Sequence, residues 1–421
     1  MTDEGLLVNQ QIGIAPAADT LVRRREWRAS EPDSIDALQV VYKVAERCNI
    51  NCSYCYYFHM GDETPLERPA YAPHAVTERL ARWMAQGCRE LRIPHAKLAS
   101  HGGEPAMIGA DTFGKACRTL RDIIEPVATL SLAIQTNGVL LDERWTDKFI
   151  EHAVGVGISI DGPQSANDRF RLDKRGRSTF QRTEDSIRRL VAARPYGAPL
   201  PSTISVLHSA NDYRDIYHYL RDLGVEELNF LLPDRNIDDD AFRASDEAVE
   251  YGRCLSEIFE AWLAEDNQAV HIKFIDQTMV HFRRSVAPGA IFRRGRKSNQ
   301  VVIARSDGTV AIDDSYIPAL DWYSGAPVHA MESHSLRDFL GNPIFDEIET
   351  MSNSMPTACG DCRWRDMCRG GDLENRFSAR NGFDNPSVYC DAYKGLYATV
   401  CERLVEGGYP SHLVTEKFGV L

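Results

Sequence analysis

The sequence lacks any apolar run long enough to cross a membrane. Spanning a bilayer takes about 20 consecutive apolar residues, and no stretch of the 421 residues comes near that length. The first residues, MTDEGLLVNQ, also lack the basic segment followed by an apolar one that marks a secretory signal. We therefore expect a cytoplasmic protein with no membrane partner.

An excess of positive charge is also missing. Lys and Arg number 48 against 61 Asp and Glu, which gives a formal net charge of −13. Proteins that bind nucleic acids usually carry a basic surface, so this balance argues against a nucleic-acid partner. One short basic run, Arg293–Lys297, is interpreted as a solvated loop.

Cysteine, in contrast, is plentiful and unevenly distributed. Without a secretory signal, cysteine clusters more often bind metal or do chemistry than form disulfides. Four of the eleven cysteines lie in helical patterns and are predicted to be small core residues: Cys88, Cys117, Cys254 and Cys401. The other seven form two groups, one at positions 48, 52 and 55 and one at positions 359, 362, 368 and 390.

The chain shows no internal repeat, but strand-like and helix-like runs alternate from Ala37 onward. Such alternation predicts parallel βαβ units, and about six fit before residue 235. Six units are fewer than the eight of a closed barrel, so the predicted fold class is α/β, with an open, partial (β/α)6 barrel. The predicted divisions are an extension at 1–36, the barrel at 37–240, a helical bridge at 241–300 and a C-terminal domain at 301–421 that starts with a hairpin over 301–313.

The first cysteine group, Cys48, Cys52 and Cys55, follows directly after the first predicted strand. Reactive groups of parallel α/β folds gather at the carboxyl ends of the strands. Three thiolates can hold three corners of an iron–sulfur cube and leave the fourth iron open to an outside ligand. Zinc is the alternative, with His59 as a fourth ligand.

The CX3CX2C spacing, with Tyr54 before the last cysteine, resembles the signature of the radical S-adenosylmethionine (radical SAM) superfamily. The resemblance implies a 4Fe-4S cluster whose open iron binds the amino and carboxylate groups of S-adenosylmethionine. It also implies that cofactor-binding residues follow the next three strands and a nearby loop. These are Tyr54, Gly102, Gly103, Glu104, Pro105, Gln135, Asn137, Ser159, Asp161 and Arg171.

Particular roles follow from the same resemblance. The segment Gly102–Pro105 matches the element that holds the methionine amino group, and Glu104 can accept a hydrogen bond from an ammonium. Ser159 and Asp161 match residues that bind the ribose hydroxyls. Arg171 is a candidate for binding the carboxylate of the cofactor. The alternative is that it is a surface arginine with no such role.

The second cysteine group has the spacing CX2CX5C followed by a distant cysteine. Four thiolates complete the coordination of a 4Fe-4S cube, although zinc also fits four thiolates. The region resembles the SPASM domain of peptide-modifying radical enzymes, which usually carries seven cysteines and two auxiliary clusters. Asp313 and Asp372 stand where two of those cysteines are expected, and none lies within 293–298. We therefore expect one auxiliary cluster, held by Cys359, Cys362, Cys368 and Cys390.

The segments 368–376 and 381–390 resemble the maturases that form cyclophanes in ribosomally synthesised peptides. The resemblance implies a C–C crosslink between an aromatic ring and a side-chain Cβ of a precursor peptide, which consists of a leader and a core. It also implies an electron donor such as flavodoxin or ferredoxin. Asp314 is the candidate catalytic base, with a solvated hairpin carboxylate as the alternative, and Asp313 and Asp372 are candidates for binding substrate.

Other outcomes remain open from the sequence. A sulfatase-type maturase would oxidise Cys or Ser to formylglycine, and further peptide maturases form thioether or ether crosslinks or epimerise residues. A zinc-stabilised binding module without catalysis is the alternative from a different class. The leader of a precursor is predicted to pair with an exposed strand edge such as that of the 301–313 hairpin.

Overall fold

The computed structural model describes residues 35, 37–283 and 301–419. The predicted extension at 1–36, apart from Ile35, and the basic run at 293–297 lie outside the described residues. Within the described residues, no helix combines the length and the apolar character needed to span a bilayer.

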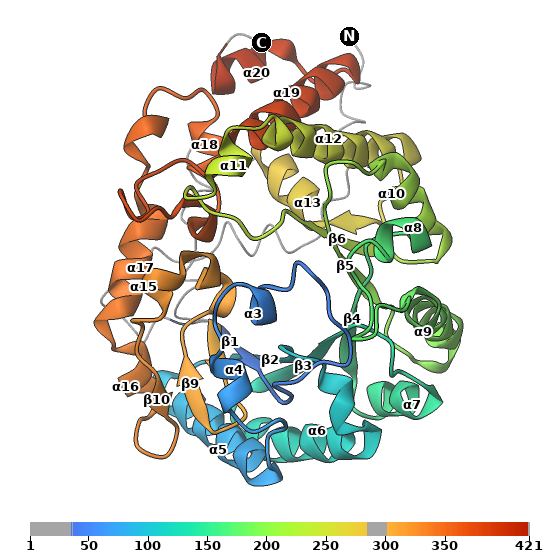
Figure 1. The fold of residues 1–421 in the computed structure, drawn as a ribbon, viewed down its shortest axis with the longest axis vertical. Helices are drawn as coiled ribbons and strands as arrows, with labels where there is room; N and C mark the ends of the chain where they lie inside the picture. Colours follow the sequence, from blue (N-terminus) through green and yellow to red (C-terminus); the bar gives the residue numbers. More distant parts are fainter. Residues whose placement is uncertain (1–34, 36, 284–300, 420–421) are drawn as a thin grey trace.

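A curved sheet of ten strands forms the centre of the molecule (Figure 1). Its order is β10-β9-β8-β1-β2-β3-β4-β5-β6-β7, and every neighbouring pair from β8 to β7 is parallel. The strands are β1 Ala37–Tyr42, β2 His95–Ser100, β3 Thr129–Thr136, β4 Val154–Ser159, β5 Ser202–Val206, β6 Glu227–Leu231, β7 His271–Ile272, β8 Val301–Ala304, β9 Thr309–Ala311 and β10 His329–Ala330. The α/β prediction is confirmed, and the six expected parallel strands are joined by β7 and β8.

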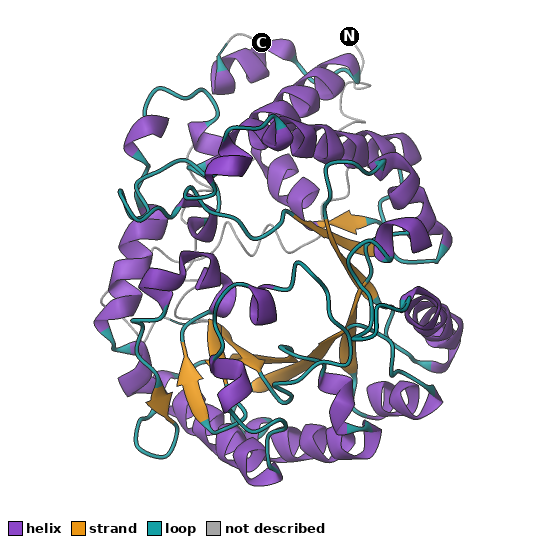
Figure 2. Cartoon of the chain, viewed as in Figure 1, coloured by secondary structure: helices purple, strands orange, loops and turns teal. Residues whose placement is uncertain are grey.

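Helices between successive strands cover the outer face of the sheet (Figure 2). Their apolar side chains recur at helical spacing, so one face of each helix is buried against the strands. In α5, for example, Leu80, Met84 and Leu91 are buried while Glu90 is exposed. The helices of this half are α3 Tyr56–His59, α4 Thr64–Glu67, α5 His74–Leu91, α6 Ala110–Ile124, α7 Glu143–Glu151, α8 Gln164–Asn167, α9 Phe180–Ala193, α10 Tyr213–Asp222, α11 Asp240–Arg243, α12 Glu247–Glu265 and α13 Lys273–Met279.

The C-terminal part is built from short helices and 3₁₀ turns together with one long helix, α19. In Figure 1, α19 lies beside α12, and close backbone contacts join the two helices. The helices of this half are α15 Leu320–Tyr323, α16 Leu336–Leu340, α17 Pro343–Asn353, α18 Arg365–Cys368, α19 Cys390–Glu406 and α20 Ser411–Phe418, with 3₁₀ turns η6 Asp314–Ala319 and η8 Leu373–Arg376.

The predicted hairpin exists as β8 and β9, but it is not separate from the barrel. β8 pairs in parallel with β1, in the register Gln39↔Val301 to Tyr42↔Ala304, and β9 pairs with β10 on its other side. The hairpin therefore has no free edge in the described part of the chain. The prediction that a leader pairs with that edge is wrong for these two strands.

The first strand ends earlier than the sequence pattern predicts. We expect the first strand to continue to Glu46, but β1 ends at Tyr42. The following residues, Lys43 to Glu46, lie outside the strand yet stay buried. The carbonyl of Val44 accepts from the N–H of Ala72 at 2.9 Å, and the N–H of Glu46 donates to the carbonyl of Ala70 at 2.9 Å. The four cysteines predicted as core residues, Cys88, Cys117, Cys254 and Cys401, are each at most 2% exposed.

Candidate cofactor-binding site

The first cysteine group lies on the loop from β1 to α3, and α3 lies over the opening of the curved sheet in Figure 1. Cys48, Cys52 and Cys55 are each half-buried and free of disulfides. The backbone N–H of Cys55 bonds to the carbonyl of Cys52 at 3.1 Å, which turns the loop tightly between the two thiols. The three thiols are close enough to influence one another electrostatically.

Burial sets the protonation of these thiols. It raises the pKa of Cys48 to about 12, and the negative charges of Glu104 and the other two cysteines add to the rise. Burial also raises the pKa values of Cys52 and Cys55. Thiols in such surroundings become thiolates when a cation compensates them, as cluster iron does. The donor set therefore fits an iron–sulfur cluster held by three thiolates.

Gly102 and Gly103 bring the chain after β2 against this loop. A Cβ on Gly103 would lie 2.2 Å from the carbonyl oxygen of Arg47, the residue before Cys48. Gly102 has φ +133°, and a Cβ there would lie 2.6 Å from Cδ of Lys43. The two glycines thus allow a close approach of backbone that side chains would prevent.

Glu104 ties this segment to the end of β3. Its carboxylate accepts hydrogen bonds from the backbone N–H of Ala106 (2.8 Å) and of Asn137 (2.7 Å) and from the Thr136 hydroxyl (2.6 Å). Burial raises its pKa, and these donors oppose the rise. Three protein donors already occupy the two oxygens, so Glu104 acts in the structure as a brace between two loops. Its predicted contact with an ammonium stays a prediction.

The predicted ribose and carboxylate residues form one buried network with Tyr54. The Tyr54 hydroxyl donates to Asp161 Oδ2 at 2.8 Å and accepts from Arg171 at 2.8 Å. Arg171 is 6% exposed, so the alternative of a surface arginine is wrong. Nearby, Gln135 donates to the Ser159 hydroxyl at 2.9 Å, and the Asn137 amide lies 3.8 Å from the Cys48 sulfur. The structure thus joins Tyr54, Asp161 and Arg171, pairs Gln135 with Ser159 and brings Asn137 next to Cys48. Their binding of a cofactor stays a prediction.

Gly157, which is not among the residues predicted from the sequence, makes one of these contacts possible. A Cβ at this position of β4 would lie 2.1 Å from Gln135 Oε1. The side chain of Gln135 therefore lies across Gly157 on its way to Ser159. The signal in the sequence is a glycine inside a strand pattern, which often marks a close approach.

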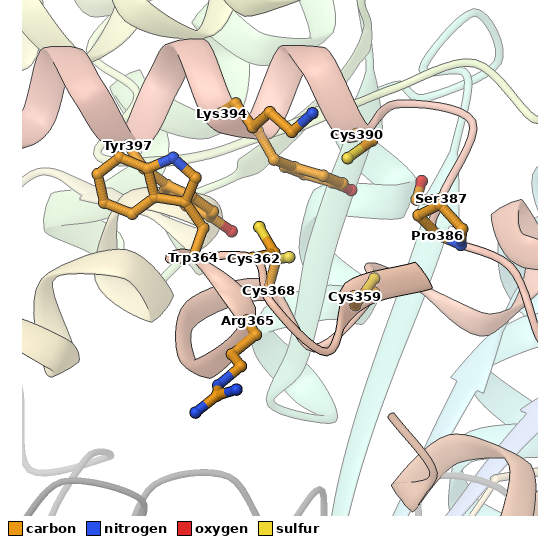
Figure 3. Close-up of a pocket in the computed structure, with 12 residues that line it drawn as sticks. Cys359, Cys362, Trp364, Arg365, Cys368, Pro386, Ser387, Cys390, Lys394 and Tyr397 are labelled. Carbon is orange, nitrogen blue, oxygen red and sulfur yellow. The ribbon is translucent and has the colours of Figure 1, made fainter. Parts of the chain in front are cut away.

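The second cysteine group lines a single pocket (Figure 3). Cys359, Cys362, Cys368 and Cys390 border the same space, together with Trp364 and Tyr397. The glycines after Cys368 are needed for the loop, since Gly370 and Gly371 have φ +87° and +83°. Burial raises the pKa of Cys368 to about 11, and the negative charge of the three other cysteines adds to it. Four thiols around one space fit a cluster with all four corners held by protein.

Within the described residues, no three His, Cys, Asp or Glu side chains are placed to hold a single metal ion. The assignment of the thiols therefore rests on the loop and the pocket that gather them. His59, the alternative fourth zinc ligand, hydrogen-bonds to Asn51 at 3.0 Å instead.

Asp314 is buried at the start of η6, so the alternative of a solvated hairpin carboxylate is wrong. It is 6% exposed and forms an ion pair with Lys43, which follows β1 and is 0% exposed. The Tyr56 hydroxyl donates to the same oxygen of Asp314 at 3.4 Å. Lys43 is not among the residues predicted from the sequence, because nothing local links residues 43 and 314. The neighbouring Asp313 caps η6 through the N–H of Ser315 at 3.0 Å.

Comparison with known proteins agrees with this geometry. The chain is similar to a cysteine-type anaerobic sulfatase-maturating enzyme of Clostridium novyi, with 22% identity over 87% of this chain and 95% of the relative. Its structure resembles that of native anSMEcpe with bound AdoMet and Cp18Cys peptide, with TM-score 0.73, 22% identity and coverage of 88% of this chain and 99% of that chain. It also resembles Streptococcus suis SuiB bound to its precursor peptide SuiA, with TM-score 0.57, 12% identity and coverage of 84% and 76%.

The sequence model of the radical SAM superfamily matches residues 42–223. That range begins at the end of β1 and includes the first cysteine group, the glycine segment after β2 and the Tyr54 network. It also contains strands β2 to β5; the glycine segment follows β2, and Asp161 of the Tyr54 network follows β4. The chain therefore contains a radical SAM domain over residues 42–223, with the fold of that superfamily.

Proposed function

We propose that the chain is a radical SAM maturase that installs a cyclophane crosslink, between an aromatic ring and a side-chain Cβ, in a ribosomally synthesised precursor peptide. The observation that carries the proposal is the set of four thiols around one pocket, with carboxylates at positions 313 and 372 where a second auxiliary cluster would need cysteines. One auxiliary cluster, rather than two, is what the resemblance to cyclophane-forming maturases implies.

The resident groups of such an enzyme are two 4Fe-4S clusters and S-adenosylmethionine. When bound, they supply a radical that removes one hydrogen atom from the peptide and an acceptor for one electron. The residues of this chain bind these groups and orient them. Cys48, Cys52 and Cys55 would hold the first cluster, and Tyr54, Asp161 and Arg171 would position the cofactor between the strand ends.

Closing a ring requires the peptide to lose two hydrogens in total. One leaves as a hydrogen atom, and the second leaves as a proton once its electron has gone to the acceptor. Asp314 is suited to take that proton, because Lys43 and Tyr56 engage only its Oδ2. Within the described residues Oδ1 receives no hydrogen bond, so it is the oxygen that can accept the proton.

A sulfatase-type maturase is the second candidate. It is favoured by the similarity to sulfatase-maturating enzymes over nearly their full length. It is disfavoured by the missing second auxiliary site. Its product differs in kind, because oxidation of Cys or Ser to formylglycine creates an aldehyde and no new ring.

The test is anaerobic co-expression with the small open reading frame beside its gene, followed by mass spectrometry of the peptide. We expect a loss of two hydrogens per crosslink. Backbone fragment ions from between the two crosslinked residues should be absent. A peptide that reacts with a hydrazide probe would instead identify formylglycine. An unchanged mass with D-residues would identify an epimerase, and either result would overturn the cyclophane proposal. Asp314→Asn should abolish the product while leaving iron content unchanged.

A further inference from the structure

Lys43 is a charged side chain placed where water cannot reach it. It is 0% exposed and follows β1 directly. Its ammonium lies 4.5 Å from the ring centre of Tyr57 and 5.9 Å from that of Tyr56. Among the described residues, Asp314 is the one carboxylate that pairs with it. Burying an ammonium is costly unless a partner compensates the charge, so this placement calls for an explanation.

Lys43 also supports the cofactor-side loop. A Cβ on Gly102 would lie 2.6 Å from its Cδ, so the glycine segment packs directly on the lysine stem. The lysine thus touches the loop after β2 with its stem and the candidate base with its head. A single side chain joins the end of β1, the segment 102–105 and the start of η6.

The other groups that face Asp314 come from several elements. Its pKa would be raised by burial, but Lys43 lowers it below the usual value, with help from His101 and Arg305. His101 itself has its pKa lowered to about 4, by burial and by Lys43, so it is neutral near pH 7. The other titratable neighbours are Tyr56 and Tyr57 on α3, Tyr323 on α15 and Asp234 after β6.

We propose that Lys43 is a positioning residue that keeps Asp314 ionised and fixes its Oδ2, so that Oδ1 can take the proton released by the substrate. The inference rests on the proposed function and extends it to a residue that does not touch the peptide. The step moves one proton from the substrate to Asp314, and the electron of that hydrogen goes to the acceptor. Without the ammonium, burial would raise the pKa of Asp314, and a smaller fraction of its carboxyl would be ionised to act as the base.

The first test needs no substrate. Infrared difference spectra between the protein and Asp314→Asn, recorded over a pH series, report when the Asp314 carboxyl becomes protonated. We expect protonation in the parent only at acid pH, and in Lys43→Met at a pH higher by about one unit or more. Lys43→Arg should keep the low protonation pH of Asp314, because arginine keeps the positive charge. An unchanged protonation pH in Lys43→Met would overturn the proposal.

The control is Lys97→Gln, an exposed lysine on the adjacent strand β2, which should leave the protonation of Asp314 unchanged. Asp234→Asn serves as a second control. Burial and the charges of Glu374 and Asp314 raise the pKa of Asp234 to about 7, so this variant shows which infrared change comes from Asp234 rather than from Asp314. If Lys43→Met does not fold, the double variant Lys43→Met/Asp314→Asn removes both charges. Recovery of folding in the double variant supports the pairing, and failure to recover argues against it.

The second test uses the peptide from the co-expressed reading frame. In Lys43→Met, we expect 5′-deoxyadenosine to form at the parent rate, while the yield of crosslinked product relative to the parent falls as the pH is lowered toward the raised protonation pH of Asp314. The product should recover as the pH is raised, since Asp314 then ionises without help. A purely structural role would lower both rates together at every pH. If no peptide is modified by the parent, the proposed function fails but the infrared result still decides the role of Lys43.

Discussion

Gly103 lies where the chain after β2 passes closest to the loop that carries the first cysteines. Its missing side chain leaves room for the carbonyl of Arg47, and the N–H of Glu104 donates to that same carbonyl at 2.8 Å. Arg47 in turn donates to the carbonyls of Pro65 and Leu66, at 2.8 and 2.9 Å. Gly103 therefore sets the position of the cysteine loop at Arg47, and the side chain of Arg47 ties the same loop to residues 65 and 66.

Replacing Gly103 by alanine tests this point. The new Cβ would meet backbone rather than a flexible side-chain end, so we expect a loss of about 1–3 kcal/mol in the free energy of unfolding. Because Arg47 precedes Cys48, iron bound at the first site should also fall. Gly155→Ala is the control, since a Cβ there would meet only ordinary contacts at 3.8 Å or beyond. Equal unfolding midpoints for the two variants, measured anaerobically, would contradict the packing argument.

At the scale of elements, residues 37–235 show how much local pattern can predict. The βα alternation, the strand ends with their glycines and the helices α5, α6, α7, α9 and α10 follow from periodicity, because each lies within one stretch of chain. The pairing of β8 with β1 joins residues more than 250 positions apart. No local pattern in the sequence encodes that pairing, so the hairpin is predicted correctly and its place in the sheet is not.

The same reason explains which site residues the sequence indicates. Cys48, Cys52 and Cys55 share one loop, and their spacing alone carries the prediction. The pair of Lys43 and Asp314 exists only because β8 carries its hairpin to the end of β1, where the N–H of Lys43 bonds to the carbonyl of Ala304 at 2.8 Å. A residue that depends on strand order becomes visible only when the fold is known.

Proline at position 302 tests whether β8 belongs to the barrel. Val302 is 0% exposed and pairs with Val40 of β1, so proline would remove a backbone donor and disturb the pairing of β8 with β1. We expect a loss of about 1–3 kcal/mol for each polar group left unpaired. Val328→Pro, at a residue 49% exposed just before β10, should change the free energy of unfolding by less than about 0.5 kcal/mol. If Val302→Pro unfolds at the same denaturant concentration as the parent, β8 does not hold the barrel together.

At the scale of the whole molecule, the two cysteine groups belong to different halves of the fold. The first lies on the β1–α3 loop over the opening of the sheet, and the second lies between α18 and the start of α19 (Figure 1). Packing of α19 on α12 joins the second half to the first, with Gly252 against the backbone of Ala392. We therefore expect the two sites to load with iron independently while the chain unfolds as one body.

Iron content measures that independence. Two cubes would give about eight irons per chain, and removing two thiolates from one site should leave about four. We expect Cys368→Ala/Cys390→Ala to lose the second cluster and keep the first, with cleavage of S-adenosylmethionine retained. The control is Cys117→Ala/Cys401→Ala, which changes two buried core cysteines outside both sites and should keep all the iron at a small cost in stability. Full iron in the first variant would show that the pocket thiols bind no cluster, whereas loss of all iron would show that the two sites depend on each other.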